Sequence, residues 1–185
     1  CARVQRWRRE AGTEEVDAGH GSFVAEVGRR GVAESVRWRW RDDDADVAAH
    51  VPAGGRVVRV RAAALNFHDV LTAMGLLTEE SVEGGVGKFA LGGEFAGVDG
   101  GHRVFGMAVS SMASKVVTAA SAYHRVPRGM VFTEAAGLPV VYLTVYWSVI
   151  EVADMQPGEW ALVHAAAGGV GLAAACRLCA RAAHA

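Results

Sequence analysis

The feature that most constrains the fold is a short apolar segment followed by a glycine-rich turn. Trp160–His164 holds four apolar residues in five positions, which is typical of a short buried strand. Gly168, Gly169 and Gly171 then turn the chain, and the small, apolar residues of Val170–Ala182 predict a helix. A strand, a glycine turn and a helix in this order are the context in which free backbone N–H groups cradle a phosphate.

The spacing of the small residues in this turn leaves two interpretations open. Ala166 stands where the full dinucleotide-binding pattern has its first glycine, so the segment reads A-x-G-x-x-G. In that pattern Gly168 lets the backbone approach a pyrophosphate, and Gly171 lets the helix pack close to the strand. The alternative is an ordinary small-residue turn between a strand and a helix.

Composition and charge argue against several classes of function. Of the 185 residues, 51% are hydrophobic and 21% are charged, which is typical of a globular protein with a core. The net charge of −1 gives no electrostatic reason to bind nucleic acid or an anionic membrane. From the sequence we expect no membrane span and no secretion signal. We therefore expect a cytoplasmic protein, and the opening residue Cys1 suggests a piece of a longer chain.

The cysteines predict neither a disulfide framework nor a zinc site. Two of the three, Cys176 and Cys179, form a C-x-x-C pair within the predicted helix. Such a pair can be redox-active or can supply half of a zinc site, but the sequence has no second pair. We interpret the two as small residues on one buried helix face, in a protein of a reducing compartment.

Short strands dominate the chain before residue 128. Val36, Trp38 and Trp40 alternate with three arginines, and this period of two predicts a strand with one buried and one solvated face. The alternation separates aromatic from basic side chains, which argues against a nucleic-acid surface. Further strands are predicted at residues 22–27, 56–62, 94–98, 103–109, 112–118 and 123–126, with a helix over 63–75.

After this β-rich part the pattern becomes helical. Thr133 can cap a helix, with Glu134 in its first turn. Pro139 then ends or kinks that helix, and Val140–Ala153 predicts a long apolar one. We therefore divide the chain into a linker or ragged edge (1–20), a β-rich domain (21–127), and a helical connection with the start of a cofactor domain (128–185).

Five motifs in a fixed order resemble those of one superfamily. The sequence contains A-A-L-N-F-H-D-V-L (63–71), L-G-G-E-F-A-G (91–97), R-V-F-G-M (103–107), E-A-A-G-L-P-V-V-Y-L-T-V-Y (134–146) and H-A-A-A-G-G-V-G (164–171). These are similar to motifs of the enoyl reductase domains of fatty acid and polyketide synthases, which are zinc-free medium-chain dehydrogenases/reductases. Zinc-dependent members have a histidine ligand where this chain has Gly93, so we expect no metal.

The resemblance implies a mixed α/β fold, with a GroES-like β-barrel followed by the truncated opening β-α unit of a Rossmann domain. It implies an NADPH-dependent reduction of the C=C bond of a trans-2-enoyl thioester carried by an acyl carrier protein. Neighbouring synthase domains and a homodimeric parent are the further partners it implies. The alternatives are a quinone oxidoreductase of the same superfamily and a non-catalytic, truncated remnant with a scaffolding role.

The resemblance also implies roles for single residues. Asn66 and Asp69 would be catalytic, although Asn and Asp at a helix start are often plain caps. Thr144 would approach the nicotinamide, although a helical threonine often bonds to its own turn. The residues bordering the pyrophosphate would be Ala167, Gly168, Gly169, Val170 and Gly171. The family's proton donors lie beyond Ala185, so we expect the isolated fragment to be inactive.

Overall fold

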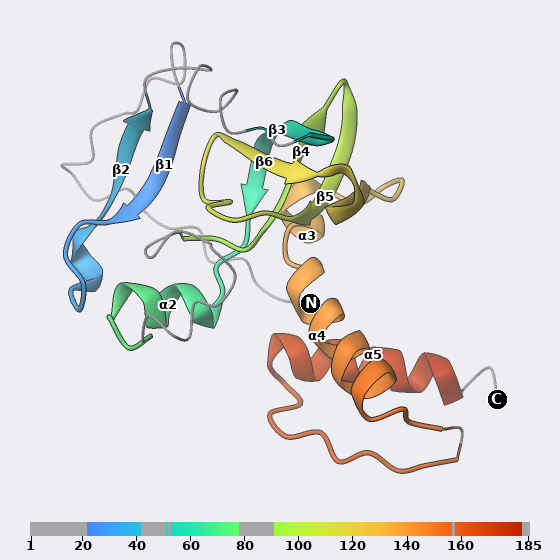
Figure 1. The fold of residues 1–185 in the computed structure, drawn as a ribbon. Helices are drawn as coiled ribbons and strands as arrows, with labels where there is room; N and C mark the ends of the chain where they lie inside the picture. Colours follow the sequence, from blue (N-terminus) through green and yellow to red (C-terminus); the bar gives the residue numbers. More distant parts are fainter. Residues whose placement is uncertain (1–21, 42–50, 52, 78–90, 157, 183–185) are drawn as a thin grey trace.

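The computed structural model describes residues 22–41, 51, 53–77, 91–156 and 158–182. Two antiparallel sheets form its first part (Figure 1). A hairpin pairs β1 (Ser22–Val27) with β2 (Val36–Arg41). A five-stranded sheet has the order β6-β3-β4-β5-β7. Its strands are β3 (Gly55–Ala63), β4 (Glu94–Asp99), β5 (His102–Met107), β6 (Lys115–Ala119) and β7 (Tyr123–Arg125).

The two faces of β4 explain where the core lies. Phe95 and Ala96 are both completely buried but point to opposite faces, as neighbours on a strand must. Phe95 belongs to one apolar cluster together with Val58 and Val116. Ala96 packs on the other side against Ala135 of helix α3 (Phe132–Ala135). The sheet therefore has an apolar layer on each face, and β4 is its central strand.

The hairpin confirms the predicted strand but not its buried face. Trp38 and Trp40 pack edge-on against the ring of Phe23, with centroid distances of 5.2 and 6.0 Å. They nevertheless remain 54% and 44% exposed. A two-stranded sheet leaves a whole face uncovered unless another layer packs on it. Among the described residues, the aromatic ring that packs against Trp38 and Trp40 is that of Phe23.

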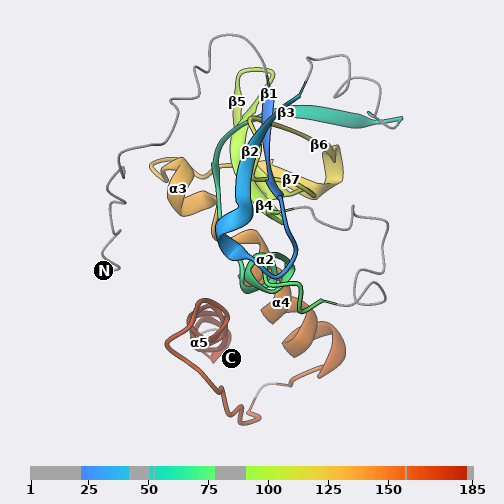
Figure 2. The same ribbon diagram turned by 90° about the vertical axis from the view of Figure 1, so that its left-hand side faces the viewer.

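The remaining helices lie beyond one end of the β strands in both views (Figures 1 and 2). Helix α2 (Phe67–Ala73) follows β3, and α4 (Pro139–Val145) runs directly into the π-helical turns of η4 (Tyr146–Val152). Helix α5 (Gly169–Ala182) packs on α4, where Val145, Ala173 and Ala174 form a small apolar cluster. This places the helix of the glycine turn directly against α4.

One of the two expectations about helix ends was wrong. Thr133 lies inside α3, and the capping contact comes from Glu134, whose carboxylate accepts the N–H of Val131 at 3.2 Å. The predicted interruption at Pro139 is present: α3 ends at Ala135 and α4 begins at Pro139, where the first helical turn needs no N–H donor from its residues.

The helical stretch also changes the expectation about membrane spans. Phe132–Val152 is, by length and composition alone, long and apolar enough to cross a membrane. One such helix is a weak indication of a membrane protein, because core helices of soluble proteins pass the same test.

The predicted strand at Trp160–His164 is not formed. The segment is irregular, and its residues are largely exposed, Trp160 completely so. A short strand of a parallel sheet depends on neighbouring strands for its hydrogen bonds, and none lies beside it among the described residues. The buried position expected for Cys176 and Cys179 was also wrong, since both are exposed on α5.

Candidate functional site

The start of helix α2 is held by a buried carboxylate. Asp69 is 3% exposed, and its two oxygens accept the backbone N–H groups of Asn66 and Gly92, each at 2.7 Å. The first contact closes the helix start in the manner of a capping box. The second ties α2 to the residues that lead into β4. Both residues predicted to be catalytic therefore lie together, and both carboxylate oxygens of Asp69 have a backbone partner.

A second buried carboxylate lies on the other side of Asn66. Glu94, 2% exposed at the start of β4, accepts the Nδ2–H of Asn66 at Oε1 (3.0 Å). Its Oε2 accepts the backbone N–H of Val140 in α4 (2.8 Å). Sequence reasoning quoted Glu94 within a motif but missed it as a site residue. The available signal was a lone carboxylate within an apolar strand, because buried charges are rare unless they are paired.

Burial dominates the electrostatics of Glu94. Desolvation raises the pKa of the Glu94 carboxyl above its usual value of 4.5, and the negative charge of Asp69 acts in the same direction. The hydrogen bonds from Val140 and from Asn66 lower the pKa and so oppose both. Such a balance between desolvation and specific partners is common at functional sites.

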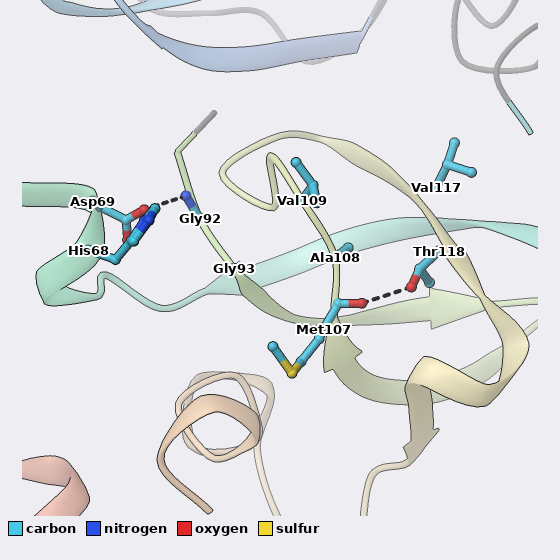
Figure 3. A pocket seen from close by; sticks show the side chains of 9 residues that line it. All are labelled: His68, Asp69, Gly92, Gly93, Met107, Ala108, Val109, Val117 and Thr118. Atoms are coloured by element: carbon cyan, nitrogen blue, oxygen red, sulfur yellow. Dashed lines mark hydrogen bonds between the residues drawn. The ribbon is translucent and has the colours of Figure 1, made fainter. Parts of the chain in front are cut away.

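A pocket of about 370 Å³ is lined on one side by Asp69 and the neighbouring His68 (Figure 3). This volume lies at the small end of the range for small-molecule sites, roughly 300–1,000 Å³. Two glycines and four apolar side chains make up most of the lining, while Thr118 donates its hydroxyl hydrogen to the carbonyl of Met107 (2.7 Å). The lining residues are His68, Asp69, Gly92, Gly93, Met107, Ala108, Val109, Val117 and Thr118.

Three backbone N–H groups at the start of α5 have no acceptor within the helix. The first hydrogen bond of α5 runs from the N–H of Leu172 to the carbonyl of Gly168 (2.8 Å). The N–H groups of Gly169, Val170 and Gly171 precede it, so no helix carbonyl accepts them, and they lie at the positive end of the helix dipole. This arrangement is what an anion requires at a helix start.

Gly171 sits where a side chain would collide with the turn. A Cβ atom there would lie 2.4 Å from the carbonyl oxygen of Ala165 and 2.6 Å from the Cα of Ala166. Close packing of this kind is the reason for the last glycine of the dinucleotide-binding pattern. The residue of the turn with a left-handed backbone is Ala165, whose φ is 51°. It directly precedes Ala166, the alanine that stands in place of the first glycine of the pattern.

Helix α4 connects the two groups of residues. Its Val140 bonds to Glu94, and the next residue, Val141, would lie 3.2 Å from a Cβ atom placed on Gly169. One turn later Thr144 donates its hydroxyl hydrogen to the carbonyl of Val140 at 2.7 Å. This is the local bond that the sequence left open as the alternative, so the role of Thr144 toward a nicotinamide stays a prediction.

A metal centre finds no support in the described ranges. They contain no group of three His, Cys, Asp or Glu side chains that could hold an ion. The position of the zinc-ligand histidine is Gly93, which lines the pocket. The absence of zinc nevertheless stays a prediction that metal analysis must test.

Comparisons with known proteins relate the chain to polyketide synthases. No family model matches it. A polyketide synthase component from Streptomyces venezuelae (PikAII) is 40% identical over 136 residues, which are 71% of this chain and 4% of that protein. The highly reducing polyketide synthase ALT1 from Alternaria alternata is 33% identical over 153 residues, 80% of this chain and 6% of that protein. The chain thus spans only a small part of these multidomain relatives.

Solved structures identify the part. The CurK enoyl reductase superimposes with a TM-score of 0.79 at 29% identity, covering 88% of this chain and 52% of that one. The JamJ enoyl reductase gives 0.73 at 25% identity, with coverage of 84% and 50%. A quinone oxidoreductase from Thermus thermophilus, solved with NADPH, gives 0.68 at 29% identity and covers 86% and 50%. The chain spans about half the length of each.

The curled antiparallel sheet and the helices that follow it define a protein of the medium-chain dehydrogenase/reductase class, with a GroES-like part and the start of a Rossmann part. Within this class the chain belongs to the enoyl reductases of polyketide synthases, of which it is a partial chain. The predicted fold class and family resemblance are thereby confirmed. The domain boundaries and the roles of single residues stay predictions.

Proposed function

We propose that this chain is part of an NADPH-dependent reductase that reduces the C=C bond of a trans-2-enoyl thioester carried by an acyl carrier protein. The observation that carries the proposal is the position of the pocket. It is lined by Asp69, which bonds to the backbone of Asn66, and Asn66 is linked through Glu94 and α4 to the glycine turn. The enoyl reductases among the similar structures support this reading.

The glycine turn is the proposed site of the cofactor's pyrophosphate. The N–H groups of Gly169, Val170 and Gly171 would donate to phosphate oxygens, and the bare backbone at Gly168 and the neighbouring Ala167 would allow close approach. NADPH, when bound, supplies the hydride. Its use is also favoured by the NADPH complex among the similar structures.

The pocket and Asn66 are proposed to hold the substrate. The methylene and methyl groups of an acyl chain suit a lining made of Met107, Val109 and Val117. The side-chain amide of Asn66 would stabilise negative charge that develops on the thioester oxygen. Because both oxygens of Asp69 accept backbone N–H groups, we propose that Asp69 supports Asn66 and is not itself the proton donor.

The proposed setting is a multifunctional synthase in the cytoplasm. Neighbouring synthase domains follow from the polyketide synthase relatives, whose length greatly exceeds that of this chain. An acyl carrier protein as substrate carrier and a homodimeric parent are proposals of the same kind.

The test compares two substrates on the complete reductase domain. NADPH consumption is followed with a crotonyl thioester and with a simple quinone. We expect turnover of the thioester, because the lining of the pocket suits an acyl chain. Turnover of the quinone alone would favour a quinone oxidoreductase, the alternative supported by the similar fold of the Thermus enzyme. Turnover of neither would favour a non-catalytic domain.

A further inference from the structure

Glu94 connects three parts of the molecule that are far apart in the sequence. Its carboxylate lies between the Nδ2–H of Asn66 and the backbone N–H of Val140. Its own backbone carbonyl accepts the hydroxyl hydrogen of the fully buried Ser111 (2.8 Å). The backbone at the start of β4 is therefore held in place. Each carboxylate oxygen of Glu94 in addition accepts a hydrogen bond from a donor outside β4.

The contact with α4 satisfies a backbone donor that has no acceptor within the helix. Val140 is the second residue of the helix, and its N–H precedes the first helical carbonyl that could accept it. An ionised carboxylate at that position also stabilises the helix dipole. Movement of Glu94 would therefore release the first turn of α4, which contacts the glycine turn through Val141 and Gly169.

We infer that Glu94 is a positioning residue, which holds the amide of Asn66 and helix α4 in a fixed relation and thereby sets the substrate pocket against the cofactor turn. This role rests on the proposed function, because only a hydride transfer requires that relation. Reaction rates depend steeply on such placement, and a displacement of about 1 Å can lower a rate about 100-fold.

The chemistry of the side chain explains why glutamate is needed. A carboxylate accepts hydrogen bonds at both oxygens, whereas the amide of glutamine has one acceptor and one donor. Glu94→Gln keeps the size of the side chain but places its NH2 group against either Val140, which can only donate, or Asn66, whose amide must then turn over to accept with its oxygen. Either the contact with Val140 is lost or the NH2 group of Asn66 leaves its position, so the relation between pocket and helix changes.

The experiment measures turnover and cofactor binding of Glu94→Gln in the complete reductase domain, with crotonyl thioester as substrate. We expect kcat to fall about 10- to 100-fold, while the Kd for NADPH stays within about threefold, because the pyrophosphate contacts are intact. Glu26→Gln is the matched control. Glu26 is an acidic side chain of β1 that pairs with Arg37 and Arg39 at the surface, so kcat should not change.

A double-mutant cycle with Asn66→Ala separates positioning from mere destabilisation. If Glu94 acts through Asn66, the double variant should be no slower than Asn66→Ala within about threefold. Losses in kcat that multiply, or a kcat of Glu94→Gln equal to that of the unmodified domain, would overturn the inference.

Amide hydrogen exchange tests the contact without substrate and without any variant that must fold. The N–H of Val140 should exchange at least about 10-fold more slowly than an unprotected amide in the unmodified domain. Exchange at the unprotected rate would refute the link between Glu94 and α4. A domain that reduces no thioester but protects Val140 would instead contradict the proposed function and leave the contact standing.

Discussion

Replacing Asp69 by asparagine should separate support from catalysis. One oxygen of Asp69 becomes an NH2 group, so either Asn66 or Gly92 loses its acceptor and faces a second donor. A hydrogen bond to a charged group contributes about 1.5–3 kcal/mol, and the surviving bond weakens because it loses its charge. Gly92 cannot turn away easily, since its φ is +86° and its surroundings are closely packed.

We therefore expect Asp69→Asn to lower the free energy of unfolding by about 3 kcal/mol. The similar reductases are about twice as long as this chain, so the complete domain should lose about 1–2 °C in Tm per kcal/mol. Thermal unfolding followed by circular dichroism should therefore show a fall of roughly 3–6 °C. Below that transition kcat should fall less than about 10-fold, because Asp69 bonds to the backbone N–H of Asn66 and not to its side-chain amide. Removal of a direct proton donor would cost about 100- to 10,000-fold.

Asp154→Asn is the control for this substitution. Asp154 is exposed and has a left-handed backbone with φ of 45°, a conformation that asparagine adopts readily, so Tm should stay within about 1 °C. An Asp69→Asn variant with an unchanged Tm and a kcat reduced more than about 100-fold would refute the supporting role and make Asp69 a catalytic residue.

Three further predictions concern the glycine turn, Glu94 and the absence of zinc. Gly171→Ala should weaken NADPH binding at least about 10-fold in a fluorescence titration, because its Cβ would lie 2.4 Å from a carbonyl oxygen; Gly137→Ala, with open space around it, is the control. Between pH 4.5 and 8 the free energy of unfolding of Glu94→Gln should fall less than that of the unmodified domain in urea titrations. The reason is that a raised pKa makes the folded state hold its proton longer, and this stability is lost as the pH rises through the pKa. Elemental analysis should find no stoichiometric zinc, since Gly93 offers no ligand; tightly bound zinc would overturn the zinc-free assignment.

The strands could be predicted from sequence because their determinants are local. Alternation of apolar and polar residues gave β2, and a short segment bounded by a glycine turn gave β1, both with the bounds found in the structure. The remaining strands were placed within a few residues. Alternation could not predict which element, if any, covers a given face of a sheet. The exposure of Trp38 and Trp40 depends on whether another element packs on the hairpin, which the pattern of one strand does not contain.

The strand prediction at Trp160–His164 was wrong for a related reason, since a strand depends on other elements even more than its burial does. Its composition is that of a buried strand, but a strand also needs partners for its N–H and C=O groups. Helix α5, whose hydrogen bonds are local, formed as predicted, although Cys176 and Cys179 on it remain exposed. Local hydrogen bonding thus separates the elements that could be predicted from those that could not.

The candidate site likewise has a part that local sequence predicts and a part that it does not. Asn66 and Asp69 are three residues apart, so a sequence pattern can show that they form one helix start. Glu94 bonds to residues 28 and 46 positions away, and only the folded chain brings these together. Two buried carboxylates near one asparagine would be unfavourable if either lacked donors. Each has two, and three of those four donors are backbone N–H groups. The single side-chain donor is Asn66, so Asn66→Ala would remove one donor from the cluster and leave its three backbone donors in place.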